Sequence, residues 1–338
     1  MSEEEAAPPP PIQASGVPEA GGGPPGAVFD LRWPSWPGWL TIVLGALLLV
    51  AGVGGLAAIQ AGQLQVAQPE VLLWGAAAGG SLVFAGLVWL AVRGVLVRRW
   101  LPPARYRGPS VFLLLILALF LATAAAVPFS ADASRLVLGT GQMSELGSLV
   151  LLTSTQVALM GVTGLFVLLP SALHGLSFLG RSTLLRSVGL GLGFGLIAWV
   201  GATLVSAFAA WLLKSAGIPP EPQAAEQALL IVDPLIAVPA VVIIAPIAEE
   251  LFFRGVVFNA WLREHGYRRA LLGSSLLFAL IHGSLLALLP IFLLGIGLAL
   301  VYERTRSLLA SMVMHATVNG ISVALALALR YDLLKLPV

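Results

Sequence analysis

Three short segments near the C-terminal end combine ionisable residues with strongly apolar surroundings. They read AEELFFRG, FALIH and HATVN, in that order. A charged side chain at the centre of a membrane helix costs roughly 2.5 to 3.5 kcal/mol, so such residues oppose insertion unless they have partners. Their presence indicates a functional site inside a helical bundle, with a structural ion pair between helices as the alternative. The polar set consists of Glu249, Glu250, Arg254, His282, His315 and Asn319.

The two adjacent glutamates are expected to do different jobs. Glu250 and Arg254 are four residues apart with the acid first, which favours an ion pair within one helix. Glu249 points about 100° away from Glu250 and has no such cation, so partial burial should make it a useful general base. Pro246, one turn earlier, lacks a backbone donor and is expected to bend the helix.

The two histidine segments supply the rest of a hydrolytic site. His315 and Asn319 are four residues apart, so both side chains emerge on one helix face. Phe278 lies one turn before His282 and is expected to pack against its ring. Water activated by Glu249 and positioned by His282 can attack a peptide carbonyl, while the His315–Asn319 pair donates to the developing oxyanion. Such a site needs no Ser or Cys nucleophile.

A zinc site is the competing assembly for the same residues. Zinc would bind three side chains and a water molecule, and Glu250 would act as the base. The HExxH arrangement is absent, Asn319 is a poor zinc ligand, and Arg254 opposes Glu250 as a base. We therefore favour a site without a cofactor and keep Zn²⁺ as the alternative. The zinc ligands would be His282, His315 and Glu249.

The composition identifies the elements that must position these residues. The chain is 58% hydrophobic and 10% charged, with a mean hydropathy of +0.96. This predicts an all-α, polytopic membrane bundle of about eight to nine transmembrane helices, because apolar stretches of about 18 to 25 residues cross a bilayer. We expect spans at residues 39–61, 71–95, 109–130, 147–172, 186–213, 229–260, 269–285, 287–303 and 307–329. Residues 269–285 and 287–303 form a re-entrant pair in the alternative.

Composition also divides the chain. Residues 1–38 are expected to be a disordered tail rich in Pro, Gly and Ala, without a cleaved signal peptide. Residues 39–215 form the N-terminal transmembrane helices, and residues 228–330 form the catalytic transmembrane core. Within residues 39–215, GLGLGFG at residues 189–195 places small residues where another helix can approach closely.

Charge and cysteine usage restrict location and chemistry. Basic residues concentrate in the even-numbered loops, so the positive-inside rule puts these loops and the N-terminus in the cytoplasm, as in a bacterial inner membrane. On this topology, the polar residues share one depth nearer the cytoplasmic surface. The chain has no Cys, which excludes disulfides and thiolate catalysis, and its net charge of +2 comes from scattered residues that do not predict nucleic-acid binding.

The three segments resemble a known set of motifs. EELFFR, FALIH and HATVN are similar, in order and spacing, to EExxxR, FxxxH and HxxxN of the CPBP family. That family, also called Abi, comprises CAAX prenyl endopeptidases and bacteriocin-processing membrane proteases, and the similarity covers residues 229–325.

The resemblance implies an all-helical intramembrane endopeptidase that acts on a peptide or membrane-protein substrate within the lipid bilayer. The family is often classed as metalloproteases, although a glutamate mechanism without metal is also argued for it. By motif position, Glu249 and His282 would activate water, the His315–Asn319 pair would form the oxyanion hole, and the ion pair within EELFFR would support the site.

Two other functions remain open at this point. A proton-coupled transporter also uses membrane Glu and His residues, although no inverted repeat is apparent. A non-catalytic immunity or scaffold protein would retain the same site. For the endopeptidase, a prenylated C-terminal peptide and an unprenylated peptide or membrane protein are both open as substrates.

Overall fold

The computed structural model describes residues 34–60, 68, 70–98, 106, 108–129, 144–168, 183–215, 217 and 233–333, and this part of the chain contains helices and no β-strand. The predicted all-α membrane bundle is confirmed. The expected disordered tail lies outside the described residues except at its end, where the first helix already begins at Trp36.

The N-terminal half contributes five long helices. Their bounds are α2 (Trp36–Gln60), α3 (Glu70–Arg98), α4 (Val111–Ala126), α6 (Glu145–Thr163) and α7 (Leu184–Ser215). A short 3₁₀ turn, Val127–Phe129, extends α4, and a π-helical turn, Gly164–Leu168, extends α6.

The C-terminal half begins with one continuous helical run of five segments. These are α9 (Pro234–Pro239), the π-helical η3 (Ala240–Ile244), α10 (Ala245–Glu250), the π-helical η4 (Leu251–Phe258) and α11 (Asn259–His265). Three helices follow, namely α12 (Tyr267–Leu280), α13 (Leu285–Thr305) and α14 (Leu308–Arg330). Ser284 and Ser307 cap α13 and α14, because each hydroxyl accepts a hydrogen bond from a backbone N–H three residues later.

Eight of the described helical segments are long and apolar enough to cross a membrane. The chain is therefore an integral, multi-pass membrane protein. The nine-span interpretation is wrong at residues 269–285, because α12 ends at Leu280 and has only 14 residues. At 1.5 Å per residue α12 is about 21 Å long, well short of a hydrocarbon core.

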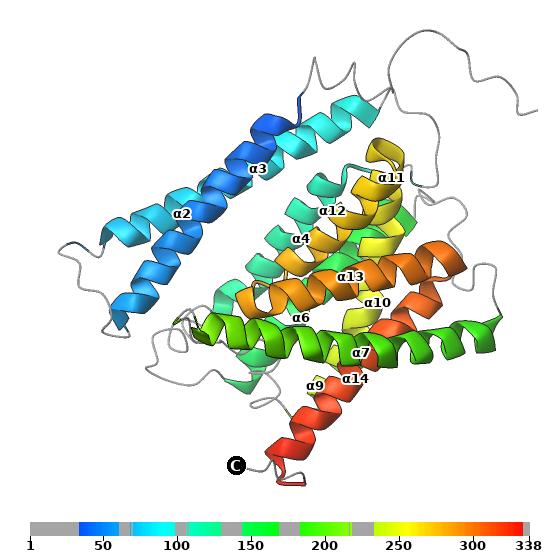
Figure 1. Ribbon diagram of the computed structural model, residues 1–338. Helices are drawn as coiled ribbons and strands as arrows, with labels where there is room; N and C mark the ends of the chain where they lie inside the picture. The colour runs from blue at the N-terminus through cyan, green and yellow to red at the C-terminus, as the bar shows by residue number, and fades with distance from the viewer. Residues whose placement is uncertain are drawn as a thin grey trace, which may run out of the picture.

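The run from α9 to α11 is the centre of the bundle. Half of its most apolar stretch is buried, against 11% for α2 and α3 and none for α7. It packs against α6, α12 and α14, while α7 lies across α13 and α14. Figure 1 shows α2 and α3 as a hairpin beside the other helices. The hairpin reaches the bundle through α3 and α4 and through the Trp39 and Phe112 rings, whose centroids are 5.7 Å apart.

Two of the predicted packing glycines bring α7 onto α14. A Cβ atom at Gly191 would lie 2.6 Å from Cβ of Val313, and one at Gly195 would lie 2.6 Å from Cβ of Thr317. Gly189 and Gly193 face open space. The glycines occupy two adjacent faces of α7. The expected close approach is confirmed for the face with Gly191 and Gly195, and not for the face with Gly189 and Gly193.

The site residues lie between two apolar clusters. The larger cluster includes Phe252, Phe253 and Phe278, and the smaller one is built around Ala237 and Val323. Along the central run, the glutamates fall between the two clusters, and the same is true of the polar face of α14. The fold therefore holds a polar layer between the two apolar clusters of the bundle.

Candidate active site

The helix that bears the two glutamates is irregular on both sides of them. The η3 turn precedes Pro246, and the wider π-helical turn accommodates a proline that an α-helix would resist, so the chain continues without a break. The η4 turn follows Glu250 at once. Because π-helical turns occur frequently at functional sites, this local geometry singles out the same short stretch as the polar residues do.

Asn259 fixes the end of the η4 turn. Its Nδ2 donates to the carbonyl oxygens of Arg254 and Gly255 at 2.8 and 3.0 Å, and to the Tyr302 hydroxyl at 2.8 Å. These bonds hold the widened backbone against α13, which carries Tyr302. Asn259 thereby holds the backbone from which the Arg254 side chain extends.

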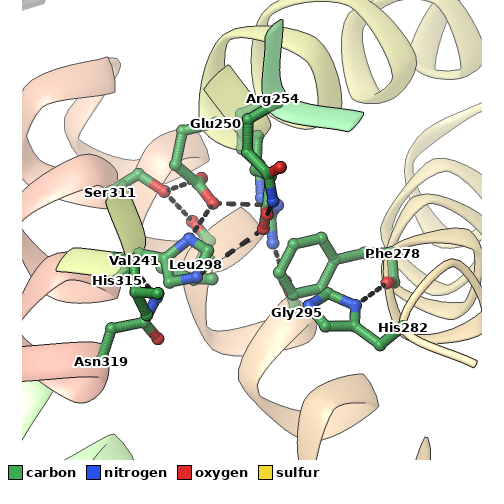
Figure 2. A network of polar contacts seen from close by, with 12 residues as sticks. Val241, Glu250, Arg254, Phe278, His282, Gly295, Leu298, Ser311, His315 and Asn319 are labelled. Carbon is green, nitrogen blue, oxygen red and sulfur yellow. Dashed lines mark hydrogen bonds and ion pairs between the residues drawn. The ribbon is translucent and has the colours of Figure 1, made fainter. Parts of the chain in front are cut away.

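Glu250 is fully buried and fully paired. Its Oε1 lies 3.1 Å from Nη1 of Arg254 and 3.1 Å from Nδ1 of His315. Its Oε2 accepts a hydrogen bond from the Ser311 hydroxyl. Figure 2 shows the carboxylate at the centre of this network. The predicted ion pair within one helix is present, and the contacts with α14 were not predicted.

Arg254 connects the carboxylate to two further helices. Its Nη2 donates to the Gly295 carbonyl of α13 at 3.0 Å, and its guanidinium lies over the Phe278 ring of α12 at 4.7 Å from the centroid. Only 1% of Arg254 is exposed. Since a buried cation needs close compensation, this residue locks three helices around Glu250.

Glu249 is also buried, with 6% of its surface exposed, but it has a different environment. Its Oε2 lies 3.8 Å from Nε2 of His315 and has no hydrogen-bond partner within the described part of the chain. Its Oε1 accepts a long hydrogen bond, 3.5 Å, from Nε2 of Gln156 on α6. One carboxylate oxygen therefore faces an imidazole without a direct hydrogen bond.

His315 stands between the two glutamates. When Nδ1 carries the proton and donates it to Glu250, Nε2 of the neutral ring is the free nitrogen that faces Glu249. The structure thus brings Glu249, Glu250 and His315 together, as the depth argument predicted. The contact between Glu250 and Nδ1 of His315 was not predicted from the sequence.

His282 lies apart from this group. It lies in a turn two residues after α12 ends at Leu280, where the helix stops because Gly283 adopts a φ of 65° and Ser284 caps α13. Nδ1 of His282 lies 2.8 Å from the Phe278 carbonyl oxygen, and the two rings meet edge to face at 5.0 Å, as expected.

The Phe278 ring also contacts His315, at 5.6 Å between centroids, and Figure 2 shows it between the two imidazoles. The expectation that His282 lies inside a helix at residues 269–285 is wrong. Its role beside Glu249 stays a prediction.

Asn319 has one clear partner. Its Nδ2 donates to the Val241 carbonyl oxygen of η3 at 2.9 Å. One of its two amide hydrogens remains for another acceptor. The structure thus shows Asn319 linking α14 to the central run one turn from His315, and its role as an oxyanion donor stays a prediction.

The same geometry bears on the zinc alternative. No group of three His, Asp or Glu side chains among the described residues is arranged to hold one metal ion. Nδ1 of His282 lies near the Phe278 carbonyl and Nδ1 of His315 is paired with Glu250, so Nε2 is the nitrogen that each ring has left for another partner. Zinc binding by His282, His315 and Glu249 stays the alternative prediction.

Comparisons with known proteins agree with the motif resemblance. Residues 231–321 match the family model described as "Type II CAAX prenyl endopeptidase Rce1-like". The chain is similar to "Putative membrane peptidase YdiL" of Bacillus subtilis, with 31% identity over 30% of this chain and 43% of that protein. It is also similar to "UPF0177 protein YxdF" of Lactococcus lactis, with 37% identity over 23% of this chain and 42% of that protein.

The chain thus spans less than half the length of these relatives. No solved structure gives a significant match. The matched region coincides with the segment that carries the polar layer, while α2 to α7 lie outside it.

Proposed function

We propose that this protein is an intramembrane endopeptidase that hydrolyses a peptide bond with water activated by Glu249. The observation that carries the proposal is the contrast between the two adjacent glutamates. Glu250 is compensated by Arg254, Ser311 and His315, whereas Glu249 keeps an oxygen without a hydrogen-bond partner in the described structure, 3.8 Å from an imidazole nitrogen. A buried carboxylate of that kind suits a general base.

The proposed reaction begins with a water molecule beside Oε2 of Glu249. The carboxylate takes one proton, and the water oxygen attacks the peptide carbonyl carbon, which produces a tetrahedral oxyanion. The remaining N–H of Asn319 donates to that oxyanion, and Nε2 of His315 donates as well when the ring is an imidazolium, with its Nδ1–H still held by Glu250. When the carbon–nitrogen bond breaks, Glu249 returns its proton to the leaving amine.

The residues around this centre have supporting roles. Glu250 orients the His315 ring through Nδ1, and Arg254 compensates the Glu250 charge. His282, with its Nδ1 near the Phe278 carbonyl, directs Nε2 elsewhere, and we assign it to the water or the substrate rather than to Glu249 directly. This proposal needs no metal ion, because proton transfer and oxyanion stabilisation both come from side chains of the chain.

Location supports the same function. An active site inside spans that run from α9 to α14 suits a substrate that is itself in the membrane, such as a membrane protein or a lipid-modified peptide. Loop charges favour a bacterial inner membrane with the N-terminus and the site near the cytoplasmic side. A prenylated C-terminal peptide and an unprenylated segment both fit this description.

Terminal proteomics on membranes tests the proposal. Cells that produce wild-type protein should contain peptide termini that are missing from cells that produce Glu249→Ala at the same level. The new termini should lie in membrane proteins near the cytoplasmic face. Identical termini in both strains would argue against peptidase activity and favour a non-catalytic scaffold.

A further inference from the structure

Gln156 is a polar side chain in the middle of the membrane helix α6, Glu145–Thr163, which lies outside the region matched to the endopeptidase family. An amide that enters hydrocarbon without hydrogen-bond partners is strongly unfavourable. Thr153, one turn earlier, satisfies its hydroxyl by donating to the Leu149 carbonyl of its own helix. Gln156 has no such local bond among those described, so its presence calls for another explanation.

The amide of Gln156 reaches across to the central helical run. Its Nε2 donates to Oε1 of Glu249 at 3.5 Å, over a sequence separation of 93 residues. The amide must present nitrogen to this carboxylate, because its oxygen would face another oxygen acceptor. Gln156 is therefore the residue from α6 that contacts the proposed base.

The oxygen atom of the same amide has no structural role in the described part of the chain. Oε1 of Gln156 is buried and has no hydrogen-bond partner within the described residues. A side chain kept only for stability would be expected to satisfy both ends, since an unpaired buried acceptor is unfavourable. The contact with Glu249 is thus the feature that distinguishes Gln156 from the other polar residues of α6.

We propose that Gln156 is a positioning residue for Glu249 in the proposed peptidase reaction. By holding Oε1, the amide fixes the rotation of the carboxylate and leaves Oε2 as the oxygen that faces His315 and receives the proton. The inference rests on the proposed function, and it adds α6 to the elements that build the active site.

A chemical label tests the contact without any substrate. N,N′-dicyclohexylcarbodiimide is an apolar reagent that attacks protonated carboxyl groups within membranes. Gln156→Met keeps the length of the side chain and removes its donor, so Oε1 of Glu249 is released from the amide and the carboxyl group becomes more accessible to the reagent. We expect labelling of Glu249, followed by mass spectrometry of the full protein in membranes, to be about three- to tenfold faster.

Kinetics test the positioning role with the substrate that the proteomic experiment identifies. Gln156→Met should lower kcat by about tenfold or more and leave KM within about twofold, because misalignment of a base affects the chemical step. Thr153→Val is the matched control, since it also removes a polar group from α6, but one whose hydroxyl donates to the Leu149 carbonyl of the same helix. It should change neither the labelling rate nor kcat.

The outcomes separate this inference from the proposed function. If wild type cleaves but Gln156→Met labels and turns over like wild type, the positioning role is wrong and the peptidase assignment stands. A rise in KM at constant kcat would also overturn it, in favour of substrate binding. If wild-type protein cleaves nothing, the proposed function fails and takes the positioning role with it, while faster labelling of Gln156→Met would still establish the contact.

Discussion

Two neighbouring residues, Glu249 and Glu250, illustrate how position on a helix decides chemistry. Glu250 faces Arg254 and α14 and is enclosed by donors, whereas Glu249 faces α6 and keeps one oxygen without a partner in the described structure. A difference of one residue turns the side chain by about 100°, which brings Glu249 within reach of Gln156 on α6, while both carboxylates remain beside His315 of α14. We therefore propose a structural role for Glu250 and a reactive role for Glu249.

The first prediction concerns the ion pair. Arg254→Ala should destabilise the protein by about 3–5 kcal/mol, because it leaves Glu250 buried without its cation. Glu249→Gln is the matched comparison and should have a melting temperature close to that of wild type. Thermal unfolding of both variants in the same detergent measures the difference, and an equal loss of stability would remove the distinction between the two glutamates.

The second prediction concerns Asn319. Asn319→Ala should lower kcat by about a hundredfold or more, the usual size of effect for the loss of one oxyanion donor. Thr317→Val is the control on the same helix, because the Thr317 hydroxyl donates to the Val313 carbonyl of its own helix and the side chain lies against Gly195 of α7. Turnover by Asn319→Ala at the rate of the control would contradict the oxyanion role.

The third prediction concerns metal. We expect purified protein to retain activity after prolonged dialysis against a strong chelator. If His282, His315 and Glu249 bind zinc after a rearrangement, the protein should instead contain about one equivalent, and activity should disappear on chelation and return when zinc is added. Metal analysis and activity measured on the same samples decide between the two.

At the scale of single residues, the sequence predicted the contacts that helical periodicity determines. The Glu250–Arg254 pair and the Phe278–His282 contact follow from a spacing of four residues, and both are present. Gln156 was missed because its partner is 93 residues away and only tertiary packing brings them together. An isolated amide within an apolar span was the available signal.

Helix boundaries explain the largest error among the elements. A continuous apolar stretch suggested a full span over residues 269–285. The sequence HGS at residues 282–284 instead ends one helix and begins the next. Gly283 takes a positive φ, and Ser284 caps the next helix. This pattern places His282 in a turn and was readable from known capping preferences.

The fourth prediction belongs to the contact between α7 and α14. Gly195→Ala should destabilise the protein by about 1–3 kcal/mol, because the added Cβ atom would overlap the Thr317 side chain. Gly193→Ala is the matched control on the same helix, since that glycine faces open space and alanine favours helix formation. Equal melting temperatures would mean that the two helices do not pack as closely as described.

The need to compensate ionisable residues in the membrane explains the arrangement of the whole molecule. Ionisable residues in a membrane require surrounding helices to compensate them, and the central run is accordingly the most buried part of the bundle. The sequence predicted this core through composition and motif order. It did not predict that α6, from the N-terminal half, would contribute Gln156 to it, because no local pattern records which helices become neighbours.

The fifth prediction concerns topology. Pro102→Cys and Pro220→Cys, introduced singly into this protein without cysteine, should react with an impermeant thiol reagent from the cytoplasmic and the outer side, respectively. Labelling of intact cells, compared with that of inverted vesicles, measures the side. Reaction of both positions from one side would overturn the assigned orientation and the cytoplasmic location of the site.

The most direct test of the central claim is peptide cleavage by purified variants that share one fold. Wild type, Glu249→Gln and Glu264→Gln are compared on the identified substrate, with melting temperature recorded for each. We predict that Glu249→Gln loses activity by at least about a hundredfold, the contribution of a general base, while Glu264→Gln, in α11 beside His265, cleaves like wild type. Cleavage by folded Glu249→Gln at the wild-type rate would contradict the account.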